Sequence, residues 1–161
     1  MNRLIDQSGV LQDSWVRYDG SQVPDAWIIA EWEQLVAGFE RLSSQFQRLG
    51  VEVPADVDVN QLTHYLHRLS LVVFRFDSFA DGRAFSQARL LRERLAFDGD
   101  IRATGQVLRD QLIFMRQCGF NQFELAQSED VDGAIDSLGS FSDNYLQRLR
   151  EPGVDSQAGR R

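Results

Sequence analysis

The most constraining feature of this 161-residue chain is an apolar run at positions 70–76, SLVVFRF. Val72 and Val73 are β-branched, which favours a strand, and apolar residues occupy both sides of that strand. A strand of this kind is stable only when both of its faces are covered. We therefore expect a sheet buried between two layers of structure.

A regular alternation of strand and helix patterns follows this run. Strands are predicted over 70–76, 100–104 and 121–125, and helices over about 83–95, 107–118 and 129–149, the last broken at Gly139. Strands joined by single helices are βαβ crossovers, which predict a parallel sheet with right-handed connections. Gly119 is placed to end the second helix in a left-handed conformation, with Phe120 making the apolar contact that accompanies such caps.

The first half of the chain has weaker patterns. Residues 3–18 alternate loosely around Gln7-Ser8-Gly9, which predicts a short antiparallel hairpin or arm. Further predictions are a buried strand in AWIIA (26–30), a helix over 31–49 ended by Gly50, an extended or looped segment over 51–60 and a short helix over about 59–69. Trp15, Trp27 and Trp32 are expected to anchor the arm on the core or to form a partner surface.

These patterns predict an α/β fold class, built as a parallel βαβαβα sheet or a partial TIM-like barrel with a short N-terminal hairpin or arm. Residues 1–150 are expected to form a single domain, with the arm over 1–22 and the βα units over 70–149. The polar residues 151–161 are expected to be a disordered tail. The helix over 107–118 is apolar on more than one side, which is compatible with a homodimer.

Composition removes several classes of function. Cys118 is the single cysteine, so the chain can form neither an internal disulfide nor a Cys-based metal cage, and the absence of lysine removes Schiff-base chemistry and the P-loop lysine. A net charge of -7 argues against nucleic-acid binding. The longest apolar run is far shorter than the roughly 20 residues that span a bilayer, and the first residues lack a secretory pattern, so we expect a cytoplasmic protein without a membrane partner.

Charge is unevenly distributed along the chain. Residues 81–116 hold seven arginines against five acidic residues, whereas the remainder is strongly acidic. Such a locally positive segment suits a small anion or an acidic partner surface.

Ligands of parallel sheets gather at the carboxyl ends of the strands, and here those loops contain glycine and lead to arginine. The candidate ligand-binding residues are Asp81, Gly82, Arg83, Arg102, Thr104, Gly105 and Arg109. The alternative is that Asp81 and Asp110 pair with these arginines and fix the loops.

Other reactive side chains favour structural roles. His64 and His67 lie on the polar side of their predicted helix, with no cysteine near them, so we expect exposed histidines and no metal site. Cys118 comes at the end of a helix, where the dipole disfavours a thiolate, which predicts a buried structural thiol. No acidic pair stands out as an acid/base couple, so catalytic residues are not assigned.

Three blocks occur in order within residues 72–125: DGRAFSQARLLRER, GDIRATGQVLRDQ and RQCGFNQFEL. On these blocks the chain resembles the bacterial family called domain of unknown function 934, whose members are described as probable oxidoreductases involved in sulfite reduction. The likeness is strong over 70–146 and looser before it. The chain departs from the family pattern at Arg75-Phe76-Asp77-Ser78-Phe79, where a proline is usual, and at Gln106, where an aspartate is common.

This resemblance implies a role in assimilatory sulfite reduction, chiefly because family members are found beside sulfite reductase genes. It implies no cofactor and names no catalytic residue. Three functions stay open at this point. The first is an accessory protein that acts on or beside sulfite reductase, without a redox cofactor of its own. The second is a small enzyme or ligand-binding domain that holds an oxyanion or phosphate-bearing ligand, and the third is a structural, dimerising half-barrel.

Overall fold

The computed structural model describes residues 3–21, 25–78 and 82–150, with side chains described up to residue 140. The strands are β1 (Leu4–Asp6), β2 (Gly9–Val10), β3 (Trp15–Arg17), β4 (Trp27–Glu31), β5 (Arg48–Glu52), β6 (Leu69–Phe76), β7 (Asp100–Gly105) and β8 (Gln122–Glu124). The α-helices are α1 (Trp32–Gln45), α2 (Arg83–Glu93), α3 (Leu112–Cys118) and α4 (Val131–Arg150), and the 3-10 turns are η1 (Val59–Leu62), η2 (Leu66–Arg68) and η3 (Arg109–Gln111). The predicted tail, 151–161, lies outside the described residues.

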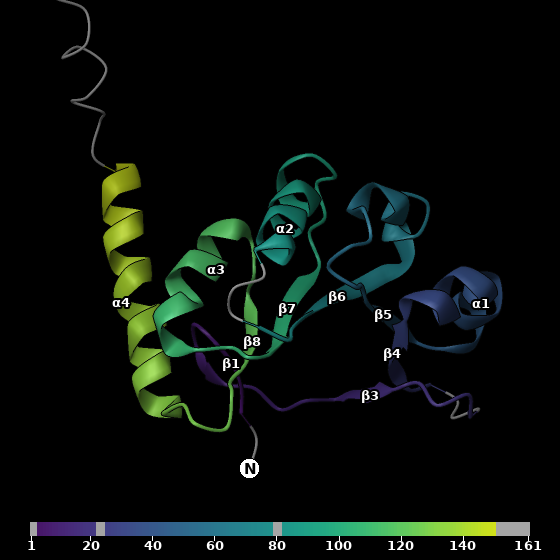
Figure 1. Cartoon of the computed structure of the whole chain (residues 1–161), viewed down its shortest axis with the longest axis horizontal. Coiled ribbons are helices and arrows are strands. Elements are labelled where there is room, and N and C mark those ends of the chain that lie inside the picture. The colour runs from purple at the N-terminus through teal and green to yellow at the C-terminus, as the bar shows by residue number, and fades with distance from the viewer. Residues whose placement is uncertain (1–2, 22–24, 79–81, 151–161) are drawn as a thin grey trace, which may run out of the picture.

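The strands form one sheet in the order β2-β1-β8-β7-β6-β5-β4-β3. Neighbours from β3 to β8 pair in parallel, whereas β1 pairs antiparallel with both β2 and β8. The sheet is curled into a half-barrel, with α1, α2 and α3 along its convex side (Figure 1). The predicted α/β class is confirmed. The sheet is partly antiparallel because the N-terminal hairpin joins it, which the sequence patterns did not indicate.

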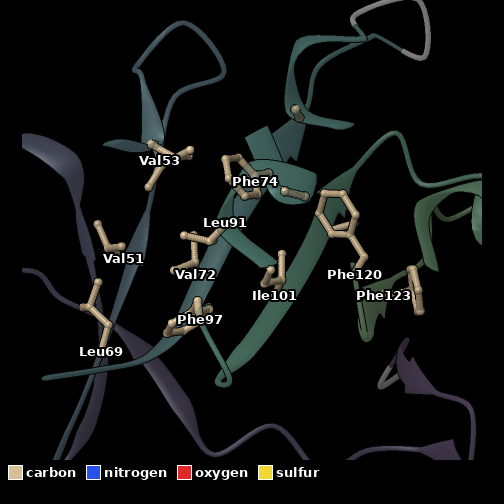
Figure 2. Close-up of a cluster of buried hydrophobic side chains, with 14 of the residues drawn as sticks. Val51, Val53, Leu69, Val72, Phe74, Leu91, Phe97, Ile101, Phe120 and Phe123 are labelled. Carbon is tan, nitrogen blue, oxygen red and sulfur yellow. The ribbon is translucent and has the colours of Figure 1, made fainter. Parts of the chain in front are cut away.

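Strand β6 is covered on both faces, as its composition requires. Val72 and Phe74 pack on the convex side in a large core, where Leu91 of α2 also lies (Figure 2). Leu71 and Val73 point to the concave side and form a small cluster with Ile29 and Trp15. The expectation of two covered faces is therefore met by helices on one side and by the N-terminal segment on the other.

Residues 11–14 connect β2 to β3 across the concave side, and we call them the strap (Figure 1). The two strands that the strap joins lie at opposite edges of the sheet. The predicted hairpin is confirmed for β1 and β2, and it does not extend past Val10. They leave the hairpin because β3 finds its partner in β4, where Trp15 is aligned with Trp27 and the two rings lie 5.6 Å apart.

The strap is tied to the sheet by a buried arginine. Arg102 of β7 is only 3% exposed, and its Nη1 and Nη2 donate to the two carboxylate oxygens of Asp13 at 3.1 and 3.3 Å. Its Nε donates to Oε1 of Gln122 at 3.0 Å. A forked, charge-assisted pair of this kind fixes geometry as well as adding stability. It therefore sets the position at which the strap crosses the sheet.

Two boundaries in the first half differ from prediction. α1 ends at Gln45, because Phe46 has an extended backbone, and residues 48–52 continue as β5. Gly50 thus lies inside a strand, where Leu49 and Val51 enter the convex core at the period of two that strands impose. The short helix expected over 59–69 is replaced by the turns η1 and η2.

The later boundaries are closer to expectation. The helix predicted over 107–118 begins with the turn η3 and is α-helical only from Leu112. α4 runs without a break through Gly139, because a glycine costs a helix about 1 kcal/mol and does not force an end. Gly119 adopts a φ of 114°, and Phe120 is buried, as the predicted cap requires.

Some surface features bear on partners. Ile113 and Phe114 of α3 are 38% and 48% exposed, so the helix has the second apolar side that its sequence indicates, and the homodimer stays a prediction.

Cys118 is buried, as expected. Within the described ranges, no helix combines the length and the apolar character that crossing a bilayer requires.

Gly50 is required by the close approach of Trp15 and β6. A Cβ atom at this position would lie 3.1 Å from Leu71 Cβ and 3.2 Å from Trp15 Cζ3. We expect Gly50→Ala to lower the free energy of unfolding by about 1–3 kcal/mol through overpacking, measured by urea denaturation. Gly82→Ala is the matched control, because a Cβ there meets nothing within 4 Å. Equal stability of the two variants would contradict this account.

Removing Asp13 should leave the Arg102 guanidinium with one side-chain acceptor, Gln122. We expect Asp13→Ala to cost about 1–3 kcal/mol in denaturant unfolding, since a buried charged donor is left unsatisfied. The exposed Glu40→Ala serves as the control, with an expected change below about 0.5 kcal/mol. Adding Arg102→Leu to Asp13→Ala should recover part of the loss. A fully stable Asp13→Ala variant would show that the pair does not hold the strap.

Candidate ligand-binding site

The carboxyl ends of the parallel strands meet at one edge of the half-barrel, which we call the rim: Glu31, Glu52, Phe76, Gly105 and Glu124. A hollow of about 640 Å³ opens at the ends of β4, β5 and β6. Its charged lining residues are Arg17, Arg75, Arg83, Glu31, Glu33, Glu52, Asp56 and Asp77. Trp32 and Pro54 are among the other lining residues. Strand carboxyl ends are where parallel sheets bind ligands, because the loops there converge.

A second hollow, of about 480 Å³, opens beside it at the ends of β7 and β8. Its lining residues are Arg75, Thr104, Gly105, Gln106, Glu124, Leu125, Ala126, Gln127 and Ser128. Arg75 lines both hollows. Arg75 is therefore shared by the two openings in the rim.

Arg75 is held by a carboxylate on the neighbouring strand. Its Nε donates to Oε1 of Glu52 at 2.9 Å, while Nη1 of Arg17 donates to Oε2 of the same carboxylate. The Glu52 side chain is 16% exposed, and the two arginine side chains are about half exposed. Ion pairs with exposed partners add about 0–1 kcal/mol to stability. The main effect of Glu52 is therefore to orient two guanidinium groups on the concave side of the rim.

The second hollow has a polar pair of its own. Thr104 is 4% exposed, and its hydroxyl donates to Oε2 of Glu124 at 2.8 Å. Gly105 has a φ of 89°, and a Cβ on it would lie 2.4 Å from the carbonyl oxygen of Phe76. Gly105 thus permits a tight turn directly beside the end of β6. The amide of Gln106 completes this turn by donating to the same carbonyl at 2.7 Å.

The structure separates the residues that the sequence analysis grouped together. Thr104 and Gly105 line the second hollow, whereas Arg83 lines the first and Gly82 precedes it at the start of α2. Arg109 follows β7 but turns to α4, where its Nε donates to the Ser137 hydroxyl at 2.8 Å. Arg109 lines neither hollow, so the structure does not bring it together with Arg83 in one pocket.

The two remaining predicted residues lie elsewhere. Arg102 is beneath the strap, with its donors directed to Asp13 and Gln122. The alternative hypothesis expects ion pairs that fix structure, and Arg102 forms one, with Asp13 of the strap. Asp81 lies outside the described residues.

Sequence reasoning missed the central residues of the rim. Arg75 is the one charged residue in the apolar run from Leu69 to Phe76, and it stands near the carboxyl end of that strand. That position was a usable signal, since ligand-contacting side chains of βα barrels come from strand carboxyl ends. Glu52 and Arg17 give no comparable signal, because the sequence predicts an extended or looped segment around Glu52 and a hairpin or arm around Arg17.

A larger hollow of about 860 Å³ lies over α1 and near His64, Tyr65 and Tyr18. Most of its lining residues belong to α1 and none belongs to the carboxyl end of a strand, so we assign the site to the rim. His64 and His67 both have exposed side chains, with ring centres within about 6 Å of the Phe39 ring. In the part of the chain that the structure describes, no group of three or more His, Cys, Asp or Glu residues could hold a metal ion.

Comparison with known proteins agrees with the blocks in the sequence. No curated protein matches the chain. A family model described as bacterial protein of unknown function (DUF934) matches residues 50–154, which include most of β5, all of β6 to β8 and most of the rim. Because this match covers well over half of the sequence, the chain belongs to the DUF934 family of bacterial proteins.

Proposed function

We propose that this chain is an accessory protein of sulfite reduction that binds a small ligand on the rim of its half-barrel, in the cytoplasm. The observation that carries the binding role is the meeting of two hollows at Arg75. The connection to sulfite reduction is supported by the sequence blocks alone. We also propose that the half-barrel is a partial TIM-like barrel, since its parallel strands curl with helices on the convex side.

The rim favours a ligand with an anionic group. A guanidinium offers five N–H donors in a plane, and Glu52 accepts from the Nε of Arg75, so it orients the group while using one donor. A sulfite, sulfate, phosphate or carboxylate group could accept from the remaining donors in a forked arrangement. Arg83 brings a second guanidinium to the same hollow. The ligand would thus lie at the strand ends of β5 and β6.

Binding fits this site better than redox chemistry does. No described cysteine or histidine lines either rim hollow. The available groups are guanidinium groups, carboxylates, amides and the hydroxyl groups of Thr104 and Ser128. Such groups orient and hold a small molecule. We therefore assign the electron transfer of sulfite reduction to the partner enzyme and the holding of a ligand to this chain.

Ligand binding is tested by thermal unfolding with sulfite, sulfate and phosphate. We expect at least one of them, at millimolar concentration, to raise the unfolding midpoint by a few degrees, because a ligand of the folded state stabilises it by mass action. Arg75→Gln should abolish this rise. Arg94→Gln, at the end of α2 and outside both hollows, should leave it unchanged. No rise with any anion, or a rise that survives Arg75→Gln, would contradict the rim site.

The pathway role is tested by growth with sulfite as the sole sulfur source. Deleting the gene in the bacterium that carries it should slow growth on sulfite and leave growth on cysteine unchanged. The wild-type chain and Arg94→Gln should restore growth, while Arg75→Gln should not. Co-purification with sulfite reductase is the expected biochemical counterpart. Unchanged growth of the deletion strain would remove the accessory role and leave the binding role standing.

A further inference from the structure

The charges around the rim do not match those of a simple anion site. The two hollows together are lined by three arginines and six carboxylates. A negatively charged ligand that made only the contact with Arg75 would also meet the repulsion of the surrounding acids. Like charges brought together in this way disfavour binding. The ligand should therefore carry positive as well as negative charge.

Positively and negatively charged side chains of the first rim hollow come from different elements of the fold. Arg17 and Arg75 share Glu52, so this group of three on β3, β5 and β6 keeps one net positive charge on the concave side. Carboxylates come from the start of α1 and from the loop after β5, where Glu33 and Asp56 are both exposed. Asp77 after β6 and Arg83 at the start of α2 also line this hollow. We call the group of three the cationic wall, and Glu31, Glu33 and Asp56 the acidic wall.

One acid on the acidic wall already has a structural task. The carboxylate of Glu31 accepts from the backbone amide of Gln34 in a capping box at the start of α1. Glu33 lies in the first turn of the same helix, where a negative charge is favoured by the helix dipole, but its side chain is not part of that box. Asp56 belongs to no helix. Within the acidic wall, Glu33 and Asp56 are therefore the carboxylates that take no part in capping α1.

We propose that the rim binds a dipolar small molecule of the amino acid type, with a carboxylate or sulfonate group on Arg75 and an ammonium group toward Glu33 and Asp56. This inference rests on the proposed rim site and narrows its ligand class. Trp32 lines the same hollow, and its ring suits the ammonium group and the short carbon chain that joins the two charges. The cationic wall then attracts the carboxylate or sulfonate group, and the acidic wall attracts the ammonium group.

The test compares ligands that differ by one charge. Glycine, β-alanine and taurine carry both charges at different separations, their N-acetyl derivatives carry only the negative charge, and glycinamide carries only the positive charge. Dissociation constants for the wild-type chain are measured by calorimetry or by protein-observed NMR. We expect at least one dipolar compound to bind about ten-fold more tightly than its N-acetyl derivative and than glycinamide, since each charge makes its own charge-assisted hydrogen bonds.

Single substitutions test which wall of the hollow binds each charge of the ligand. Glu33→Gln should reduce the preference for the free amine by about ten-fold and leave sulfate binding equal or tighter. Arg75→Gln should weaken every compound that carries a carboxylate or sulfonate. Glu40→Gln, on the same helix but outside the rim hollows, is the control and should change neither.

The outcomes separate this inference from the function on which it rests. If sulfate or the N-acetyl compounds bind in an Arg75-dependent way and no dipolar compound binds more tightly, the rim site stands and the dipolar ligand class is wrong. If glycinamide matches the best dipolar compound, the cationic wall has no role and the inference is also wrong. If no compound in any group binds, both proposals fail.

Discussion

The structure depends on the length of the strap. From Val10 to Trp15 the chain has five Cα steps and can reach at most about 18 Å. The strands that it joins are separated by seven neighbour spacings in the sheet, which would be roughly 34 Å if the sheet were flat. The sheet must therefore curl until its two edges approach each other. The half-barrel is thus imposed by a connection of four residues as well as by the twist of the strands.

The strap also explains why the concave side is open at one end. It enters β3 at Trp15, which is aligned with Trp27 at the start of β4, so it crosses the amino-terminal part of the parallel strands. Ile29, Leu71 and Val73 are buried on this side together with Trp15. The carboxyl ends of the strands are left uncovered by the strap, and both rim hollows open there. The same connection that closes the apolar part of the concave side leaves the polar rim to solvent.

The sequence predicted those parts of the fold that have local signals. The two-faced strand β6, the alternation after it and the left-handed Gly119 are each recognisable from a few neighbouring residues. The destination of Trp15 is not, because β3 pairs with a strand that begins twelve residues later. Gly50 was misread for a related reason. Its role is set by Trp15 and by β6, and neither contact is visible in the residues beside it.

The candidate site was less predictable, because the charge of a sequence segment is not the charge of a surface. The arginines of residues 81–116 suggested a positive loop cluster, but folding directs most of them to different acceptors. Arg92 donates to the carbonyl oxygens of Phe97, Gly99 and Gly119, and its burial lowers its pKa without removing its charge. Arg102 binds the strap.

Two further arginines of that segment are directed to other acceptors in the same way. Arg109 binds Ser137 of α4, and Arg116 donates to the side chain of Gln7. The rim takes only Arg83 from this segment and adds Arg17 and Arg75 from outside it, together with acids from α1 and the β5 loop. The side chains that decide what this rim can hold therefore come mainly from β3, β5 and β6, from the loop after β5 and from the start of α1, and the curl of the sheet brings them together.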